Sequence, residues 1–169
     1  MQRPITDFGV DDEGDPFAVL SCGHRQHVRH APPFTNRPWV MTQAGRRSKL
    51  GVMLNCARCE RFEFPEGFEC YRSTPVFDEN SVPAGLRRDH NTRPGVWGRI
   101  VVETGTLRYV VDALDRVFEL DPRNPGTVVP EMPHRVEPVG AVRFRVEFWR
   151  ARAGDTASPD SRGEPGVSL

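Results

Sequence analysis

The chain lacks several features that would assign it to a common class of protein. Its 169 residues include four cysteines and one lysine, and no apolar run is long enough to span a membrane. The first fifteen residues contain no apolar signal-peptide core, so we expect a cytoplasmic protein without a membrane partner. Cysteines in a reducing compartment more often bind metal than form disulfides.

Net charge and several catalytic motifs are absent as well. Basic and acidic residues number 23 each, and the arginines are spread along the chain. This balance argues against a nucleic-acid partner. The sequence contains no G-x-S-x-G, no H-E-x-x-H and no phosphate-cradling loop, which excludes the corresponding hydrolases and nucleotide-binding proteins.

What the chain has in abundance is proline and glycine, 16 and 15 residues, with a mean hydropathy of −0.53. This composition is typical of short strands joined by turns. The sequence predicts a hairpin around residues 11–15, one helical turn before "CARC", and two strands around the turn "ETGT". The alternation in "AVRFRVEFWR" predicts a half-buried strand.

These patterns predict a mainly β protein with two folded units. We expect a small N-terminal unit stapled by zinc at residues 1–64, and a β-barrel at residues 70–150. Residues 151–169 are polar and rich in glycine, proline and serine, and are predicted to be a disordered tail.

The segment "CGHRQHVRH" and the later "CARC" have the chemistry of a zinc site. Thiolate and imidazole are preferred zinc ligands, and a C-x2-C pair can hold one side of a tetrahedron. We predict the ligands Cys22, Cys56, Cys59 and His24, with His27 as the alternative histidine. Four protein ligands close the coordination sphere, so such a zinc ion would be structural.

The N-terminal pattern, "CGHRQHVRHAPP", "RPWV" and the C-x2-C pair, resembles a short bacterial domain without an assigned function. The resemblance covers about residues 1–64. It implies that these residues form one unit, and it implies no activity.

The later blocks "DHNTRPGVWGRIVVETGTLRY" and "PHRVEPVGAVRFRVEF" resemble the cupin-like domain of the tellurite-resistance protein TehB and of YeaR-type proteins. The resemblance implies a small barrel with His90 and His134 near its mouth. Two imidazoles and a carboxylate would form an open zinc or iron site, for which Glu137 is the preferred carboxylate and Glu147 the alternative. Thr92 stands where cupins carry a second histidine, which weakens this ligand set.

Three further residues could line the pocket of the barrel: Arg93, Trp97 and Arg99. A tryptophan within a strand is also a common core residue. TehB proteins add a methyltransferase domain, but this chain has no glycine-rich cofactor loop, so methyl transfer is not predicted.

Three functions therefore remain open from the sequence. The first is a metal-binding, cupin-like protein that binds a small molecule or oxyanion during chemical stress of the tellurite or nitrosative type. The second is a metal-dependent enzyme acting on a small polar substrate. The third is an adaptor that binds a protein partner through the zinc unit. The sequence leaves both catalysis and homo-oligomer formation undecided.

Overall fold

A computed structural model describes residues 1–152 of the chain. The predicted disordered tail lies, apart from its first two residues, outside the described residues. None of the helices within residues 1–152 is long and apolar enough to cross a membrane. The elements in chain order are β1 (Gln2–Val10), β2 (Pro16–Leu20), β3 (Arg25–His27), η1 (Pro38–Met41), α1 (Gln43–Arg47), β4 (Met53–Asn55), α2 (Ala57–Glu60), β5 (Phe68–Ser73), β6 (Phe77–Asp78), β7 (Trp97–Val111), η2 (Asp112–Leu114), β8 (Arg116–Leu120), β9 (Gly126–Val128) and β10 (Arg135–Ala151).

The N-terminal sheet has four antiparallel strands in the order β3-β2-β1-β4. Its central hairpin, β1 and β2, confirms the turn predicted at residues 11–15. The carboxylate of Asp11 accepts the backbone N–H groups of Glu13 and Asp15, and Gly14 has a positive φ of 90°. An aspartate followed by glycine thus closes the turn with little strain.

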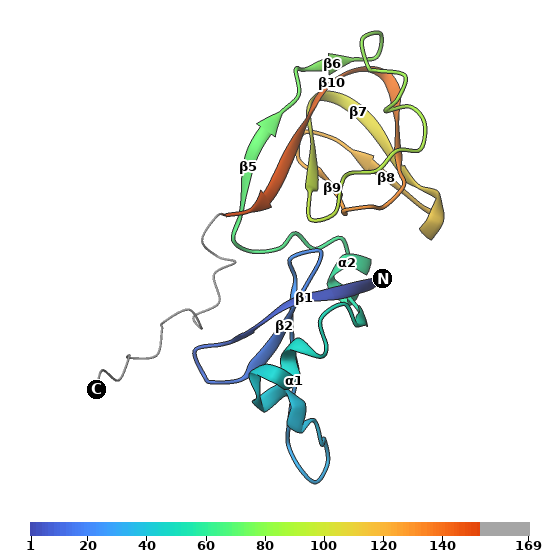
Figure 1. The fold of residues 1–169 in the computed structure, drawn as a ribbon. Helices are drawn as coiled ribbons and strands as arrows, with labels where there is room; N and C mark the ends of the chain where they lie inside the picture. Colours follow the sequence, from blue (N-terminus) through green and yellow to red (C-terminus); the bar gives the residue numbers. More distant parts are fainter. Residues whose placement is uncertain (153–169) are drawn as a thin grey trace, which may run out of the picture.

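The second sheet has six strands, with the two long strands β7 and β10 paired at its centre. The free edge of β10 is covered by β5 and β6, and that of β7 by β8 and β9. Buried Val142 and Phe144 alternate with exposed Arg143 along β10, as the sequence pattern predicts. The protein is thus mainly β, and Figure 1 shows the two sheets one above the other.

The prediction of two strands around "ETGT" is wrong, because β7 continues through this segment as one strand of 15 residues. At Gly105 the pairing with β10 shifts register, and φ is +80°. A Cβ at this glycine would lie 2.1 Å from the carbonyl oxygen of Ala141. The glycine therefore allows the neighbouring strand to approach closely, and it marks a bulge in place of a hairpin turn.

The two sheets share one hydrophobic core. Residues of both halves also form polar contacts across the junction. The guanidinium of Arg3, 6% exposed, donates to the carboxylate of Glu131 at 2.9 Å and to the carbonyl of Pro130 at 2.6 Å. The indole Nε1 of the fully buried Trp97 donates to the carbonyl oxygen of Cys22 at 2.7 Å.

Candidate metal centre and adjoining cavity

A tight turn after β2 places Cys22 and His24 side by side. The N–H of Gly23 donates to the carbonyl of Leu20, and the N–H of Leu20 donates to the carbonyl of His24. Gly23 adopts a φ of +85°, which favours glycine. A Cβ at this position would also lie 2.5 Å from the ring of Phe68 on β5.

The C-x2-C pair lies at the start of α2. Cys56 is the residue before the first helical turn, and Cys59 is buried within the turn. One helical turn separates the two side chains, so both can face the same point. The N–H of Cys56 donates to the carbonyl of Met1, which fixes this pair beside β1.

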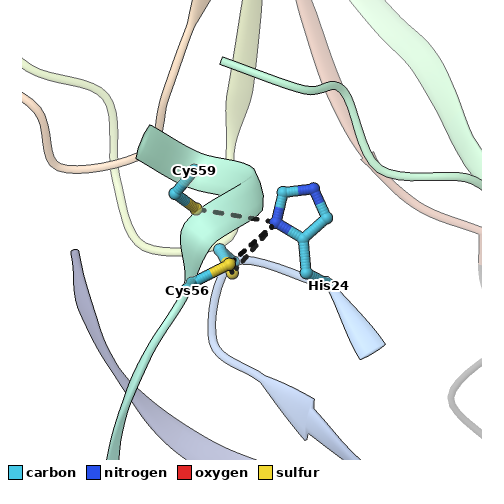
Figure 2. Close-up of side chains that lie close together, drawn as sticks. His24, Cys56 and Cys59 are labelled. Atoms are coloured by element: carbon cyan, nitrogen blue, oxygen red, sulfur yellow. Dashed lines mark hydrogen bonds between the residues drawn. The ribbon is translucent and has the colours of Figure 1, made fainter. Parts of the chain in front are cut away.

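The four predicted ligands come together as a compact, buried cluster. The Nδ1 atom of His24 lies 3.5, 3.3 and 3.6 Å from the sulfurs of Cys22, Cys56 and Cys59, and the first two sulfurs are 3.8 Å apart. Figure 2 shows the side chains of Cys56 and Cys59 directed towards the His24 ring. With Zn–S bonds of about 2.3 Å and Zn–N bonds of about 2.05 Å, a tetrahedron requires about 3.6 Å between sulfur and nitrogen and about 3.8 Å between sulfurs. The cluster could therefore bind a metal ion such as zinc.

The orientation of His24 also fits a metal ligand. Its Nε2 atom lies 3.1 Å from the carbonyl oxygen of Glu63, which can only accept a hydrogen bond. The Nε2 atom therefore carries the proton, and Nδ1 presents its lone pair to the three sulfurs. Anchoring of the second ring nitrogen by a backbone carbonyl is the usual support for a metal-binding histidine.

The crowding of three thiols favours one thiolate when no cation is present. A hydrogen bond from the Cys59 thiol, aided by the backbone N–H of His24, lowers the pKa of Cys22 to about 4. Burial raises the pKa of Cys56, and the hydrogen bond to Cys22 raises the pKa of Cys59. All three cysteines are free, and the sulfur distance of 3.8 Å is far too long for a disulfide. A divalent cation would offset the charge of the additional thiolates.

The other histidines of the motif lie away from this cluster. His27, the alternative ligand, is exposed on β3, and its Nε2 atom lies 2.8 Å from the carboxylate of Asp11. His30 accepts the backbone N–H of Arg37 through Nδ1.

His90 and His134, the histidines predicted to lie at the barrel mouth, lie next to each other as a second, separate histidine pair. They are joined by two backbone hydrogen bonds of 3.0 and 2.9 Å, and their ring centroids are 4.2 Å apart. The Nδ1 atom of each ring lies within 3.0 Å of a backbone carbonyl oxygen, at Arg88 and Met132 respectively. Each Nε2 therefore keeps its lone pair. Burial lowers the pKa of His134 to about 4.

The two predicted carboxylates do not lie with these histidines. Glu137 is paired with Arg135 and Arg108, and Glu147 with Arg145. Successive side chains of a strand point to opposite faces, and these glutamates alternate with the apolar residues of β10. Within residues 1–152, no group of three ligating side chains includes the histidine pair.

A cavity of about 500 Å³ adjoins the histidine pair. Its wall is mostly apolar and includes Ile100, Val128 and Phe148. Its polar lining residues come from two segments: Asn91 to Arg93, which follow His90, and Tyr71, Arg72 and Thr74, at the end of β5.

Of the predicted substrate-binding residues, Arg93 lines this cavity, whereas Trp97 and Arg99 do not. Trp97 is fully buried and packs edge-on against His24, with ring centroids 5.3 Å apart. Arg99 is exposed on β7, where alternation turns it away from its buried neighbour Ile100. Trp97 therefore supports the metal centre, which the sequence alone did not suggest.

The fold and the clusters describe a mainly β protein with a buried cluster of three cysteines and one histidine, and with a cavity that opens to solvent. Two known families match parts of the chain, each over less than half of its length. Residues 6–63 match the family described as "Protein of unknown function (DUF3565)", and residues 72–146 match the TehB-like domain.

Individual relatives resemble the C-terminal part. The probable S-adenosyl-L-methionine-dependent methyltransferase TehB of Haemophilus influenzae is 35% identical over 40 residues, which are 24% of this chain and 14% of that protein. The uncharacterised protein YeaR of Escherichia coli strain K12 is 28% identical over 99 residues, 53% of this chain and 83% of YeaR. The crystal structure of a protein of E. coli K12 with 28% sequence identity superimposes with a TM-score of 0.50. The alignment covers 53% of this chain and 97% of that protein's chain. The chain thus spans a small part of the methyltransferase and most of YeaR.

Proposed function

We propose that this protein is a zinc-stabilised, cupin-like binding protein that takes up a small oxyanion in a chemical-stress response of the tellurite or nitrosative type. The match of residues 72–146 to the TehB-like domain supports the link to that response. The cavity beside the histidine pair supports small-molecule binding, and it is the observation that carries the proposal.

The lining of the cavity suits an oxyanion that retains a proton. His90 and His134 each have an Nε2 lone pair, which accepts a hydrogen bond from a hydroxyl group. Arg93 on the same wall can donate to the charged oxygens of such an ion. The apolar remainder of the wall lowers the local dielectric, which strengthens both interactions.

In this proposal the zinc ion has a structural role. Cys22, His24, Cys56 and Cys59 would hold it, and the ion would cross-link the turn after β2 to helix α2. Such a cross-link stabilises a unit with a small core.

Calorimetric titration of the zinc-loaded protein with tellurite and selenite, which both retain a proton near neutral pH, tests oxyanion binding. We expect at least one of these ions to bind. His90→Leu removes a neutral hydrogen bond and Arg93→Gln a charge-assisted one, so each should reduce the affinity about tenfold or more. Arg99→Gln is the matched control, since Arg99 lies outside the cavity. Equal affinities in all four proteins, or no binding by the wild type, would contradict the proposal.

A metal-dependent cupin enzyme is the second candidate. The observation that favours it is the anchoring of both Nδ1 atoms by backbone carbonyls, the support typical of metal-binding imidazoles. Elemental analysis after incubation with Fe²⁺ or Zn²⁺ would then find two metal ions per chain, of which one is lost in His90→Leu. A single ion in both proteins removes this candidate.

A further inference from the structure

The stretch from Pro16 to Cys59 contains seven basic residues and no acidic residue. The rest of the chain carries 16 basic and 23 acidic residues. The zero net charge of the whole chain therefore conceals a positive charge of seven in this stretch. Its basic residues are Arg25, Arg29, Arg37, Arg46, Arg47, Lys49 and Arg58.

Within residues 1–152, six of these seven side chains form no ion pair with a carboxylate. Among residues 1–152, ion pairs of this group are formed by Arg58 alone, with Glu63 and Glu66. The other six lie in residues 25–49, here named the basic segment. The acidic turn between β1 and β2 contacts the basic segment at His27, through Asp11. Six unpaired cations within 25 residues repel one another, and a bound polyanion would relieve this repulsion.

The basic segment continues around both faces of the N-terminal sheet. The guanidinium of Arg25 lies 4.9 Å from the ring centroid of Phe17, and the ammonium of Lys49 lies 5.6 Å from that of Trp39. The Trp39 ring packs on Phe8 of β1, and Phe8 lies opposite Ala18 of β2, so their side chains share one face of the sheet. Phe17 is the next residue of β2 and points to the other face. Because neighbouring residues of a strand point to opposite faces, Arg25 and Lys49 lie on opposite sides of the sheet.

An exposed aromatic ring lies in the middle of the basic segment. Phe34 is 96% exposed, at the tip of a short loop closed by backbone hydrogen bonds between Ala31 and Thr35. No other large apolar side chain of the described residues is as exposed. Figure 1 shows this loop and α1 at the end of the N-terminal unit remote from the six-stranded sheet.

We propose that the basic segment binds single-stranded nucleic acid, with its arginines on the phosphates and Phe34 stacked on a base. Cationic side chains with an exposed aromatic ring form the usual surface for single strands. Arginine suits phosphate because its planar guanidinium can donate two parallel hydrogen bonds. This function is independent of the cavity, which is lined by residues of the second half.

An anionic bilayer is the other polyanion that a basic, aromatic surface can bind. A bilayer is flat and would reach one side of the sheet, so Arg25 and Lys49 could not both contact it. A flexible single strand can follow the segment from one side to the other. The distribution of the cations therefore favours the nucleic acid.

Fluorescence anisotropy of the full-length, zinc-loaded protein tests this proposal. The probes are labelled 20-nucleotide oligo(U) RNA, oligo(dT) DNA and a 20-base-pair DNA duplex, and the lipid control is vesicles of 70% phosphatidylcholine and 30% phosphatidylserine. We expect a single strand to bind most tightly, and five phosphate contacts would weaken binding about 100-fold between 50 and 200 mM salt. The RNA and DNA arms show which strand is preferred.

Matched variants assign the binding to the segment. Arg29→Glu and Arg47→Glu should each weaken oligonucleotide binding about tenfold, and Phe34→Ala about fivefold or more. Arg123→Glu changes the net charge equally but lies in the second half, between β8 and β9, and should bind like the wild type. All four side chains are exposed, so the variants should fold normally. Binding to vesicles without oligonucleotide binding, no binding at all, or equal affinities of the Arg47→Glu and Arg123→Glu variants would each overturn the proposal.

Discussion

The two histidine-containing clusters of this protein differ in how many ligands face one point. In the N-terminal cluster, the carbonyl of Glu63 holds Nε2 of His24, and Nδ1 faces three sulfurs within 3.6 Å. In the second cluster, carbonyls hold Nδ1 of His90 and His134, and a cavity of about 500 Å³ takes the place of further ligands. The first arrangement closes a coordination sphere, whereas the second leaves room for a molecule.

This difference shows that an anchored imidazole alone does not define the role of a site. The same kind of carbonyl hydrogen bond orients the rings in both clusters. The three neighbouring thiols mean that the first cluster could bind a metal ion, and in our proposal the largely apolar cavity beside the second binds a small molecule. Substitutions that perturb one cluster at a time separate the two roles.

The largest effect is expected from Cys56→Ser. Zinc bound by such sites contributes about 10–16 kcal/mol of apparent folding free energy, which equals or exceeds the whole stability of most domains. We expect the variant to lose its zinc and residues 1–64 to unfold, as measured by elemental analysis and circular dichroism. Cys70→Ser is the control, because Cys70 is exposed and outside the cluster. A Cys56→Ser protein with full zinc content and an unchanged melting curve would disprove the metal centre.

Gly23→Ala should destabilise the turn that carries the cysteine and histidine of the metal centre by about 2–4 kcal/mol. The cost combines a left-handed backbone with the close approach of Phe68. Urea unfolding of the zinc-loaded protein measures it. Gly14→Ala has the same backbone strain, with φ of +90° and no atom near the added Cβ, so it should cost about 1 kcal/mol. Equal losses in the two variants would show that the contact with Phe68 contributes nothing.

The pH dependence of stability should be dominated, in the second half, by His134. Burial lowers its pKa to about 4. The charge of His90 acts in the same direction, whereas the hydrogen bond to the Met132 backbone and the charge of Asp89 raise the pKa. The unfolded chain, with a pKa near 6.5, binds the proton first as the pH falls. Protonation of His134 therefore leaves the free energy of unfolding unchanged above about pH 6.5 and decreases it by up to about 3 kcal/mol towards pH 4.

The His134→Gln variant isolates this contribution, since glutamine does not titrate. Urea unfolding of both proteins between pH 4 and 7 should give a steeper loss for the wild type. Parallel curves would mean that His134 is not buried as a neutral group.

The smallest effect is expected at the junction between the two halves. Trp97→Phe removes the hydrogen bond to the buried carbonyl of Cys22 and should cost about 1–3 kcal/mol. Trp149→Phe is a matched control, because the Nε1 of Trp149 is buried without a partner and its removal loses no hydrogen bond. If both substitutions cost the same in urea unfolding, the Trp97 bond does not couple the metal centre to the six-stranded sheet.

The domain boundaries proposed from the sequence, at residues 64 and 70, remain a prediction. The shared core and the contacts of Arg3 and Trp97 provide a reason for the halves to stabilise each other. A fragment of residues 68–152 that folds with the thermal stability of the whole chain would support separable units. A fragment without a cooperative transition would show that the halves depend on each other.

The cluster of three cysteines and one histidine was predictable because its sequence signals are local. A C-x2-C pair and a C-x-H pair fix their side chains within one turn each, so spacing alone indicates that each pair can face one ligand. The sequence also predicted the hairpin at residues 11–15 and the alternation of β10. It did not reveal that Trp97 and the carbonyl of Glu63 support the centre, because these contacts join residues far apart in the chain.

The second half shows the limit of the same approach. The family resemblance predicts His90 and His134, but it does not determine which face of β10 Glu137 and Glu147 occupy. Strand alternation turns both glutamates towards arginines. The glycine in "ETGT" predicts a turn, but Gly105 uses its left-handed backbone conformation to form a bulge within the long strand β7.

The sequence by itself determined the β-rich character, the ligand set of the candidate metal centre and the acid-free stretch from residue 16 to residue 59. These depend on residue type and on spacings of a few positions, which short-range sterics and ligand chemistry fix. Only the tertiary structure decided which residues line the cavity, which carboxylates turn away from it, and that the basic segment reaches both sides of the sheet. Those properties depend on strand register and on packing between distant segments, where one residue of shift exchanges the two faces of a strand.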